Sequence, residues 1–199
     1  MPNFQYSSNG LDLTKQFEGI RLNAYQDSVG VWTVGYGHTG SDVVRGLTIT
    51  AQQADILLAA DVAWAVTAVN KAVQTVINQN QFDALVDFTF NLGAASFTGS
   101  TLLRLLNAGN FAGASAEFIR WNKAKKKVLA GLTRRRQAET DLFNTPPILR
   151  TGVSLKAFAA PETTKKATKK KTKKKSAKKA VKTTVKKAAK KKAAPKKSK

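Results

Sequence analysis

The sequence predicts an α+β domain that is mostly helical, followed by a chemically distinct cationic segment. Apolar residues recur at helical spacing through much of residues 50–143, whereas residues 22–47 are rich in Gly, Val, Tyr and Thr, as in a small antiparallel sheet. Of the 34 Lys and Arg residues, 19 lie in residues 161–199 together with one acid, so this segment carries +18 of the formal net charge of +22. We therefore expect a domain over residues 1–147, an extension or linker over 148–162 and a polycationic tail over 163–199.

The N-terminal part of the domain is predicted to contain a short helix and then the sheet. Leu11, Leu13 and Phe17 combine apolar spacings of helical type with charged positions between them, which indicates a helix ending near Gly19. Between residues 22 and 47, local alternation and frequent glycines indicate short strands and tight turns.

A long helix is predicted over residues 50–76. Thr50 and Gln53 have the spacing of a capping box, in which each side chain bonds to the backbone of the other residue. The run that follows contains no Pro or Gly, and its apolar residues have helical periodicity, so we expect one long buried helix. The apolar positions that support it are Ile56, Leu57, Ala60, Trp64, Val69, Val73 and Val76.

Four further helical segments complete the domain. Each is closed or separated by a glycine or a polar turn, and Pro146 and Pro147 stop the last one. These predicted helices cover residues 81–92, 100–107, 111–121 and 132–143.

Composition excludes several kinds of chemistry. The sequence has no Cys, which excludes disulfides and thiolate chemistry, and with His38 as the one histidine we expect no zinc cluster, no other metal and no cofactor. The first ten residues lack the charged and apolar regions of an export signal, and no apolar run approaches the roughly 20 residues of a membrane span. We therefore expect synthesis in the cytoplasm without a signal peptide.

Two carboxylates near the junction of the first helix and the sheet are candidates for glycosidic chemistry. Glu18 lies beside Phe17 and Ile20, and an apolar setting favours the protonated form that a general acid needs. Asp27 lies in a polar turn, where it would stay ionised and could activate water. A Glu at a helix end and an Asp in a turn are also commonplace, so the spacing of the pair alone favours a purely structural interpretation.

The longer string around these residues is more specific. Glu18, Asp27 and Thr33 form the pattern Glu-x8-Asp-x5-Thr, followed at once by Val-Gly-Tyr-Gly-His-Thr, which resembles the catalytic segment of the phage-type lysozymes, the muramidases that tailed bacteriophages use as endolysins. The resemblance implies a small lobe bearing the sheet, a long connecting helix, and a larger helical lobe, with the peptidoglycan strand in the groove between the lobes. It covers about residues 8–145 and continues through residues 81–93, 100–109 and 131–143.

The resemblance also implies roles for the three residues. Glu18 is the general acid, Asp27 the base that activates or positions water, and Thr33 a hydroxyl that helps to hold that water. The reaction is hydrolysis of the β-1,4 bond between N-acetylmuramic acid and N-acetylglucosamine with inversion, for which the two carboxyl groups stand about 6.5 to 9.5 Å apart. We expect a monomer that acts on peptidoglycan after release to the cell wall.

Two supporting pairs follow from the same resemblance. His38 is expected to pair with Asp61 on the connecting helix and join the sheet to it, an interpretation preferred over acid–base work. Phe90 and Asn91 match cleft-lining positions of the family, although core packing explains Phe90 equally well.

The last predicted helix contains a run of three arginines. Its helical stripe of Leu132, Arg135, Arg136, Glu139 and Leu142 directs Arg135 and Arg136 inward and Arg134 outward. The family resemblance puts an arginine of this helix near the catalytic Glu, and Arg135 is the candidate. Lys123 and residues 125–127 form a basic loop, which we interpret as solvated.

The tail departs from the family. It consists mainly of Lys, Ala, Thr and Ser, so like-charge repulsion opposes compaction and we expect disorder until it meets an anion. It resembles linker-histone tails, and such a polycation binds lipopolysaccharide, anionic membranes or nucleic acid without distinguishing among them. Two functions stay open: an endolysin-type enzyme whose tail binds anionic envelope polymers, or a polyanion-binding or membrane-disrupting protein in which the enzyme domain is secondary.

Overall fold

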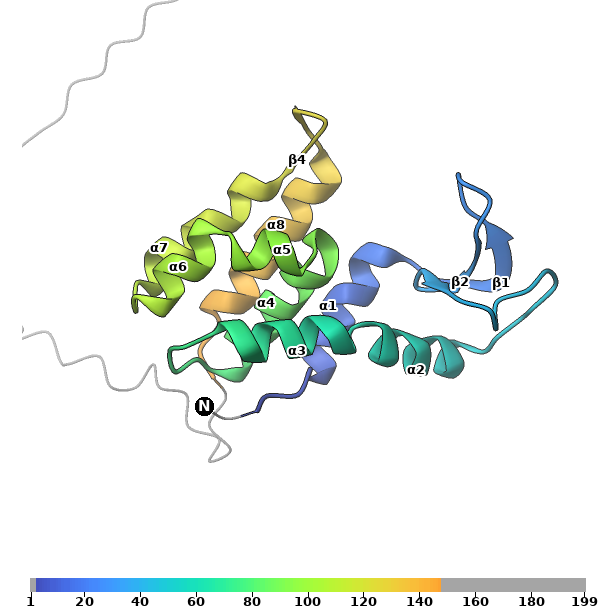
Figure 1. Cartoon of the computed structure of the whole chain (residues 1–199), viewed down its shortest axis with the longest axis horizontal. Helices are drawn as coiled ribbons and strands as arrows, with labels where there is room; N and C mark the ends of the chain where they lie inside the picture. The colour runs from blue at the N-terminus through green and yellow to red at the C-terminus, as the bar shows by residue number, and fades with distance from the viewer. Residues whose placement is uncertain (1–2, 148–199) are drawn as a thin grey trace, which may run out of the picture. The chain divides into compact units, whose positions relative to one another are not determined.

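The structure, a computed structural model, describes residues 3–147 (Figure 1). Helix α1, Ser8–Glu18, begins where the Ser7 side chain accepts a hydrogen bond from the Gly10 amide. It ends at Gly19, whose φ of 69° is favourable for glycine. The predicted helix end near Gly19 is confirmed. The extension and the tail, residues 148–162 and 163–199, lie outside the described residues.

The predicted antiparallel sheet is present and small. Strands β1 (Arg21–Gln26), β2 (Trp32–Gly35) and β3 (His38–Thr39) pair in that order. The register of β1 against β2 shifts between Arg21 and Tyr25. Most of the stretch from residue 40 to residue 49 is loop, joined to β1 by a bridge between Asn23 and Thr48. The sheet therefore needs the packed loop and α2 to cover its inner face.

The long helix predicted over residues 50–76 is two helices, so that prediction is wrong in continuity and length. Helix α2 (Ala51–Asp61) begins with the predicted capping box of Thr50 and Gln53. The chain turns at Val62, and helix α3 spans Ala63–Ala72. Val62 is 1% exposed, so a buried aliphatic residue marks the break. Hydrophobic periodicity contains no signal for such a break.

The buried face of these helices agrees with the predicted one only in part. Of the predicted apolar positions, Val69 and Val73 are buried. Ile56 and Trp64 on the helices and Val76 beyond them are 62%, 46% and 75% exposed. The other buried residues of α2 and α3 are Ala54, Leu58 and Ala65.

Helix α4, Gln79–Leu92, lies at the centre of the helical part. Asn78 and Gln81 form its capping box, and Gly93, with φ of 89°, ends it. Residues 82–89 are all buried, because α1, α3 and α8 pack around this helix. The helix predicted over residues 81–92 is therefore confirmed, with a start two residues earlier.

The remaining elements follow α4 in the sequence, and α5 and α8 pack against it. The helices predicted over residues 100–107 and 132–143 are confirmed within two residues, and the one predicted over 111–121 ends in a 3-10 turn. The sequence does not predict the short helix α5 or the two-stranded hairpin. The elements are α5 (Ala94–Thr98), α6 (Thr101–Asn107), α7 (Phe111–Glu117), the 3-10 turn (Phe118–Trp121), β4 (Lys123–Ala124), β5 (Lys127–Val128) and α8 (Ala130–Asn144).

Two separate hydrophobic cores divide the described residues into two lobes. The larger core surrounds α4, and a smaller one, formed by Val34, Val43, Ile49 and Ala54, lies beneath the sheet. In Figure 1 the sheet lies beyond the ends of α1 and α2, to one side of the helices. The mostly helical α+β class with one small three-stranded sheet is confirmed. No helix of residues 3–147 has the length and apolar character that a membrane crossing requires.

Candidate active site

Glu18 lies where the two lobes meet. It is the last residue of α1, and Gly19 and Ile20 connect this helix to β1. Its side chain is 27% exposed and borders two cavities, one of about 610 Å³ toward α8 and one of about 260 Å³ toward the sheet. We call these two cavities together the Glu18 hollow. A carboxyl at this position faces any ligand that spans both lobes.

The surroundings of Glu18 combine the predicted apolar residues with a charged group. Phe17 lines the larger cavity beside Glu18, and Ile20 lines the smaller one. The Glu18 carboxylate also accepts a hydrogen bond of 2.6 Å from the Arg135 guanidinium. The predicted apolar setting is therefore incomplete, because a buried cation contacts the carboxylate. The contact between Glu18 and Arg135 agrees with the expected placement of this arginine.

Arg135 is held rigidly by Asp87 of α4. Its Nε and one terminal nitrogen each donate to the Asp87 carboxylate at 2.9 Å, which is a bidentate pair between a 4% and a 0% exposed residue. Burial lowers the pKa of Arg135, but the negative charges of Asp87 and Glu18 outweigh burial and leave the pKa raised. Arg135 is therefore a fixed cation with one N–H group directed at Glu18.

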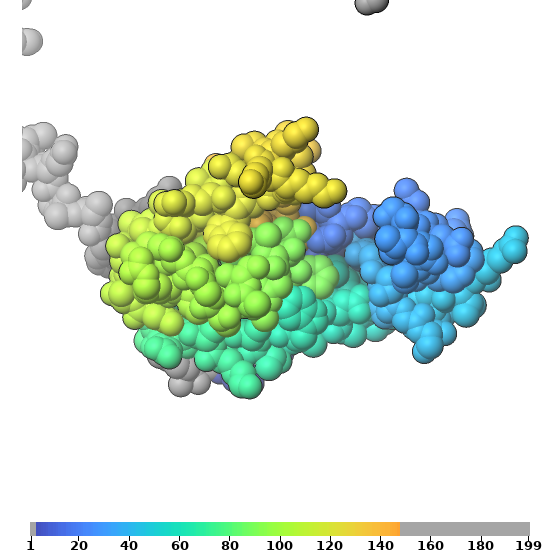
Figure 2. All heavy atoms as spheres, turned by 45° about the horizontal axis from the view of Figure 1, so that its top comes forward, coloured from blue at the N-terminus to red at the C-terminus, as the bar shows by residue number. Residues whose placement is uncertain are grey.

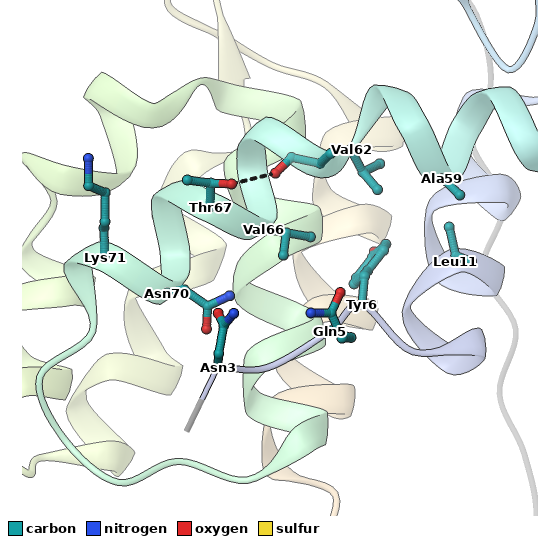
Figure 3. A pocket seen from close by; sticks show the side chains of 11 residues that line it. Asn3, Gln5, Tyr6, Leu11, Ala59, Val62, Val66, Thr67, Asn70 and Lys71 are labelled. Atoms are coloured by element: carbon teal, nitrogen blue, oxygen red, sulfur yellow. Dashed lines mark hydrogen bonds between the residues drawn. The ribbon is translucent and has the colours of Figure 1, made fainter. Parts of the chain in front are cut away.

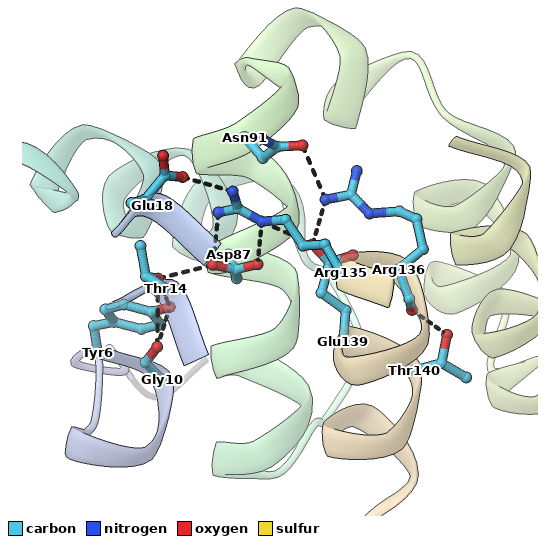
Figure 4. A network of polar contacts seen from close by, with 10 residues as sticks. All are labelled: Tyr6, Gly10, Thr14, Glu18, Asp87, Asn91, Arg135, Arg136, Glu139 and Thr140. Carbon is cyan, nitrogen blue, oxygen red and sulfur yellow. Dashed lines mark hydrogen bonds and ion pairs between the residues drawn. The ribbon is translucent and has the colours of Figure 1, made fainter. Parts of the chain in front are cut away.

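The polar chain continues behind Asp87 (Figure 4). The Thr14 hydroxyl donates to Asp87 at 2.8 Å, and the Tyr6 hydroxyl contacts Thr14 and donates to the Gly10 carbonyl, each at 2.7 Å. Burial raises the pKa of Tyr6, so its hydroxyl stays protonated. Helix α1, supported by Tyr6, thus orients Asp87 through Thr14, and Asp87 in turn orients Arg135.

A second buried arginine lies beside the first. Arg136 is 0% exposed, pairs with Glu139 and donates to the Asn91 side chain at 3.0 Å. Burial raises the pKa of Glu139 well above its ordinary value, and the nearby charge of Asp87 raises it further. The predicted inward direction of Arg135 and Arg136, and the outward direction of Arg134, are confirmed.

Asp27 occupies the turn between β1 and β2. Its Oδ1 atom accepts hydrogen bonds of 2.9 Å from the amides of Val29 and Val31, and its own amide donates to the Val31 carbonyl. This self-capping is why Asp is favoured in such turns. Within residues 3–147 no hydrogen bond is made by Oδ2, so one carboxylate oxygen is oriented by the turn and the other is available to a ligand or water.

Thr33 lies on β2 and is connected to the same turn. It is 5% exposed, and its hydroxyl donates to the Val31 carbonyl at 3.1 Å. Donation to the backbone leaves the oxygen lone pairs as acceptors for water. Asp27 and Thr33 therefore form one group, joined through Val31, while Glu18 and Arg135 form another. The two cavities of the Glu18 hollow are lined by neither Asp27 nor Thr33.

His38 joins the sheet to α2. Its Nδ1 atom lies 2.9 Å from the Asp61 carboxylate, as expected, and its Nε2 atom lies 3.1 Å from Asp42, a partner that the sequence does not predict. Burial lowers the pKa of His38, but the hydrogen bonds to Asp61 and Asp42 outweigh this effect, so the pKa is raised. Both ring nitrogens are engaged, which agrees with a structural role.

The raised pKa of His38 gives a testable pH dependence of stability. A group with a raised folded pKa contributes fully below its unfolded value of about 6.5 and loses this contribution as the pH rises through the folded value. We expect His38→Gln to lower the free energy of unfolding by about 1 kcal/mol at low pH and by less at high pH. Urea unfolding of both proteins, at about one unit below and two units above the unfolded pKa, measures the difference. An equal loss at both values contradicts the ion pair.

Phe90 and Asn91 separate in the structure. Asn91 lines the larger cavity of the Glu18 hollow and is oriented by Arg136. Phe90 lines neither cavity of the hollow, and its ring lies 6.1 Å from that of Trp64. The packing interpretation therefore fits Phe90 better.

Several polar residues of this network are not predicted from the sequence. Asp87, Thr14 and Tyr6 are the most important, whereas Glu139 lies on the predicted stripe of α8 without a predicted role. A signal for Asp87 exists, since Asp83 and Asp87 are four residues apart in the run 82–88, whose other residues are all apolar, so both carboxyl groups need partners if this run is buried. Within residues 3–147 no group of three or more His, Asp or Glu side chains is placed to hold a metal ion.

Another cavity lies away from Glu18, beneath the N-terminal segment (Figure 3). It has a volume of about 670 Å³ and is lined by Tyr6 and by residues of α3, with Asn70 and Lys71 at one end. Asn70 is already bonded to both backbone groups of Phe4. This cavity contains no arrangement of carboxylates suited to glycosidic chemistry.

Comparisons with known proteins agree with this geometry. A family model described as phage lysozyme matches residues 15–139, which include Glu18, Asp27 and Arg135. The endolysin of Acyrthosiphon pisum secondary endosymbiont phage 1 is 46% identical over 143 residues, or 70% of this chain and 97% of that protein. The endolysin of Bacillus phage PZA is 48% identical over 154 residues, or 75% of this chain and 60% of that protein. A crystal structure of a mutant P22 lysozyme matches with a TM-score of 0.68 and 44% identity, covering 71% of this chain and 99% of that one.

Proposed function

The chain belongs to the phage lysozyme family and is a glycoside hydrolase of the muramidase type, and from this premise we propose that Glu18 and Asp27 carry out the hydrolysis. The proposed substrate bond is the β-1,4 bond between N-acetylmuramic acid and N-acetylglucosamine in bacterial peptidoglycan. The observation that carries the proposal is the position of Glu18, a carboxyl at the junction of two lobes, facing two cavities and oriented by a fixed arginine.

Glu18 is proposed as the general acid that protonates the leaving oxygen. Arg135 donates to the Glu18 carboxyl, and the buried Asp87 carboxylate holds the guanidinium in place through two hydrogen bonds. Arg135 and Asp87 thus act as positioning residues for the carboxyl.

Asp27 and Thr33 are proposed to hold the water that attacks the sugar. Asp27 Oδ1 is fixed by two backbone amides, which leaves Oδ2 as the base, and the Thr33 oxygen can accept a hydrogen bond from the same water. A water placed between a separate acid and base is the arrangement of an inverting glycosidase. Inversion is therefore part of the proposal.

The identity of the new reducing end tests the proposed bond. Purified peptidoglycan is digested, reduced with borohydride and hydrolysed, and the reduced amino sugars are then separated. A muramidase leaves N-acetylmuramic acid at the new reducing end, so borohydride converts that sugar to its alcohol. Reduced N-acetylglucosamine, or new amino termini from peptide cleavage, would contradict the proposal.

The cationic segment is proposed to increase action on whole cells by binding anionic envelope polymers such as lipopolysaccharide. The support is compositional, namely +18 over residues 161–199. It would act by local concentration, after the enzyme is released to the cell wall, and contributes no group suited to acid catalysis.

Deletion after Ala160 separates these two roles. Turnover on soluble peptidoglycan fragments is expected to stay within about twofold of the parent value. Lysis of outer-membrane-bearing cells should fall, and the loss should be greatest at low ionic strength. Salt screens contacts between the lysines and anionic surfaces over about 10 Å at 0.1 M. Turbidity clearing at several salt concentrations, with added nucleic acid as a competitor, measures the effect. Equal lysis by both proteins at low salt would contradict the proposed role.

A further inference from the structure

The hairpin of residues 123–128, which we call the lysine hairpin, presents four lysines on an exposed turn. Its register pairs Lys123 with Val128 and Ala124 with Lys127, so Lys125 and Lys126 are the two central residues. All six residues are exposed. Among residues 3–147 no acid forms an ion pair with these lysines. Four cations therefore lie together without internal neutralisation.

The tip of the lysine hairpin has a backbone conformation that does not favour lysine. Lys125 and Lys126 have φ of 47° and 66°, and they are the non-glycine residues with positive φ in the described part of the chain. Two-residue turns of this kind favour Asn-Gly, and a side chain in the left-handed region costs roughly 1 kcal/mol per residue. Local stability therefore does not explain why two lysines occupy this tip.

The lysine hairpin borders the Glu18 hollow. Leu129 and Gly131, which follow it directly, line the larger cavity together with Glu18 and Arg135. Its base is fixed, because the Leu129 amide donates to the Asn122 carbonyl at 3.0 Å. In Figure 2 the hairpin, in yellow, projects from the helical lobe beside the end of α1. The lysines are thus held at the rim of the hollow.

We propose that the lysine hairpin binds the carboxylates of the peptide stems on the peptidoglycan strand that occupies the Glu18 hollow. This inference rests on the proposed function, because a bound strand is what brings the stems to the rim. Stems project from each muramic acid and carry free carboxylates, while lysine amines on flexible four-carbon chains suit anions whose position varies. Other polyanions have no fixed relation to the hollow, so the location of the lysine hairpin favours the stems.

Replacement of the two lysines at the turn tests the role of their charge without destabilising the fold. The double variant Lys125→Asn with Lys126→Gly removes two charges and introduces the residues that this turn prefers, so thermal stability should be kept or raised. Lys71→Asn with Arg104→Gln is the matched control, since it makes the same charge change at exposed or solvent-facing positions outside the Glu18 hollow. All three full-length proteins are assayed on soluble peptidoglycan strands whose stem carboxylates are either free or converted to amides by carbodiimide coupling with ammonia.

The comparison of the two strand preparations decides the outcome. For the parent protein and the control, amidation should lower kcat/KM about three- to tenfold, as expected for two or more exposed charge contacts. For the hairpin variant, kcat/KM on free strands should already be lowered, and amidation should change it by a clearly smaller factor than in the parent, because two of the four lysines remain. An equal amidation effect in all three proteins would overturn the role of the lysine hairpin while leaving the proposed function intact. Failure of the parent protein to cleave either preparation would overturn both.

Discussion

Glu18→Gln is expected to lower kcat on peptidoglycan by at least about a thousandfold. General acid catalysis typically contributes factors of 10² to 10⁴, and an amide has no proton to give to the leaving oxygen. The fold should be kept, because the Gln oxygen can still accept the hydrogen bond from Arg135, and Asp87 still holds the guanidinium. Release of reducing ends from soluble strands, measured beside the midpoint of thermal unfolding, checks both parts.

Asp12→Asn is the matched control for this variant. Asp12 lies on the same helix, is 74% exposed and lines neither cavity of the Glu18 hollow. It should keep nearly full activity. If Glu18→Gln retained more than about a tenth of the parent activity, its role as the general acid would be wrong.

Asp27→Asn should be nearly as severe, with a loss in kcat of at least about a hundredfold. Asparagine can still accept the amides of Val29 and Val31 through its carbonyl oxygen, so the turn should keep its shape. The atom that replaces Oδ2 becomes a donor and can no longer take a proton from water. Steady-state kinetics on soluble strands should show the change in kcat rather than in KM.

The exposed residue Asp141, changed to Asn, is a suitable control for Asp27→Asn. Its contact is with Gln137 on the outer face of α8, outside the Glu18 hollow. If Asp27→Asn lowered kcat no more than Asp141→Asn does, Asp27 would not be the base. The proposal that Asp27 and Thr33 hold the same water would then also fail.

Local sequence signals were sufficient for most of the fold. The capping pair of Thr50 and Gln53 acts over a few residues, and so do the glycines at 19 and 93. Sequence pattern and structure therefore agree at those helix ends. The break at Val62 is different, because nothing in the local sequence opposes helix there. Its position depends on how α2 packs on the sheet while α3 packs on α4, which is a tertiary effect.

The site shows the same division between local and distant information. The turn of Asp27 is local, and its hydrogen bonds follow from the sequence of that turn. The setting of Glu18 is not local: Arg135 is 117 residues away, and Asp87 is 48 residues from Arg135. Neighbours in sequence therefore supply the apolar part of this setting, whereas neighbours in space supply the charged part.

The anomeric form of the first product tests the central claim most directly. Proton NMR during rapid hydrolysis of soluble strands distinguishes the α from the β form of the new reducing end before mutarotation mixes them. A water activated by Asp27 on the face opposite the leaving group, with Glu18 as acid, requires the α form to appear first. Initial formation of the β form would mean retention, and it would contradict the roles assigned here to Glu18 and Asp27.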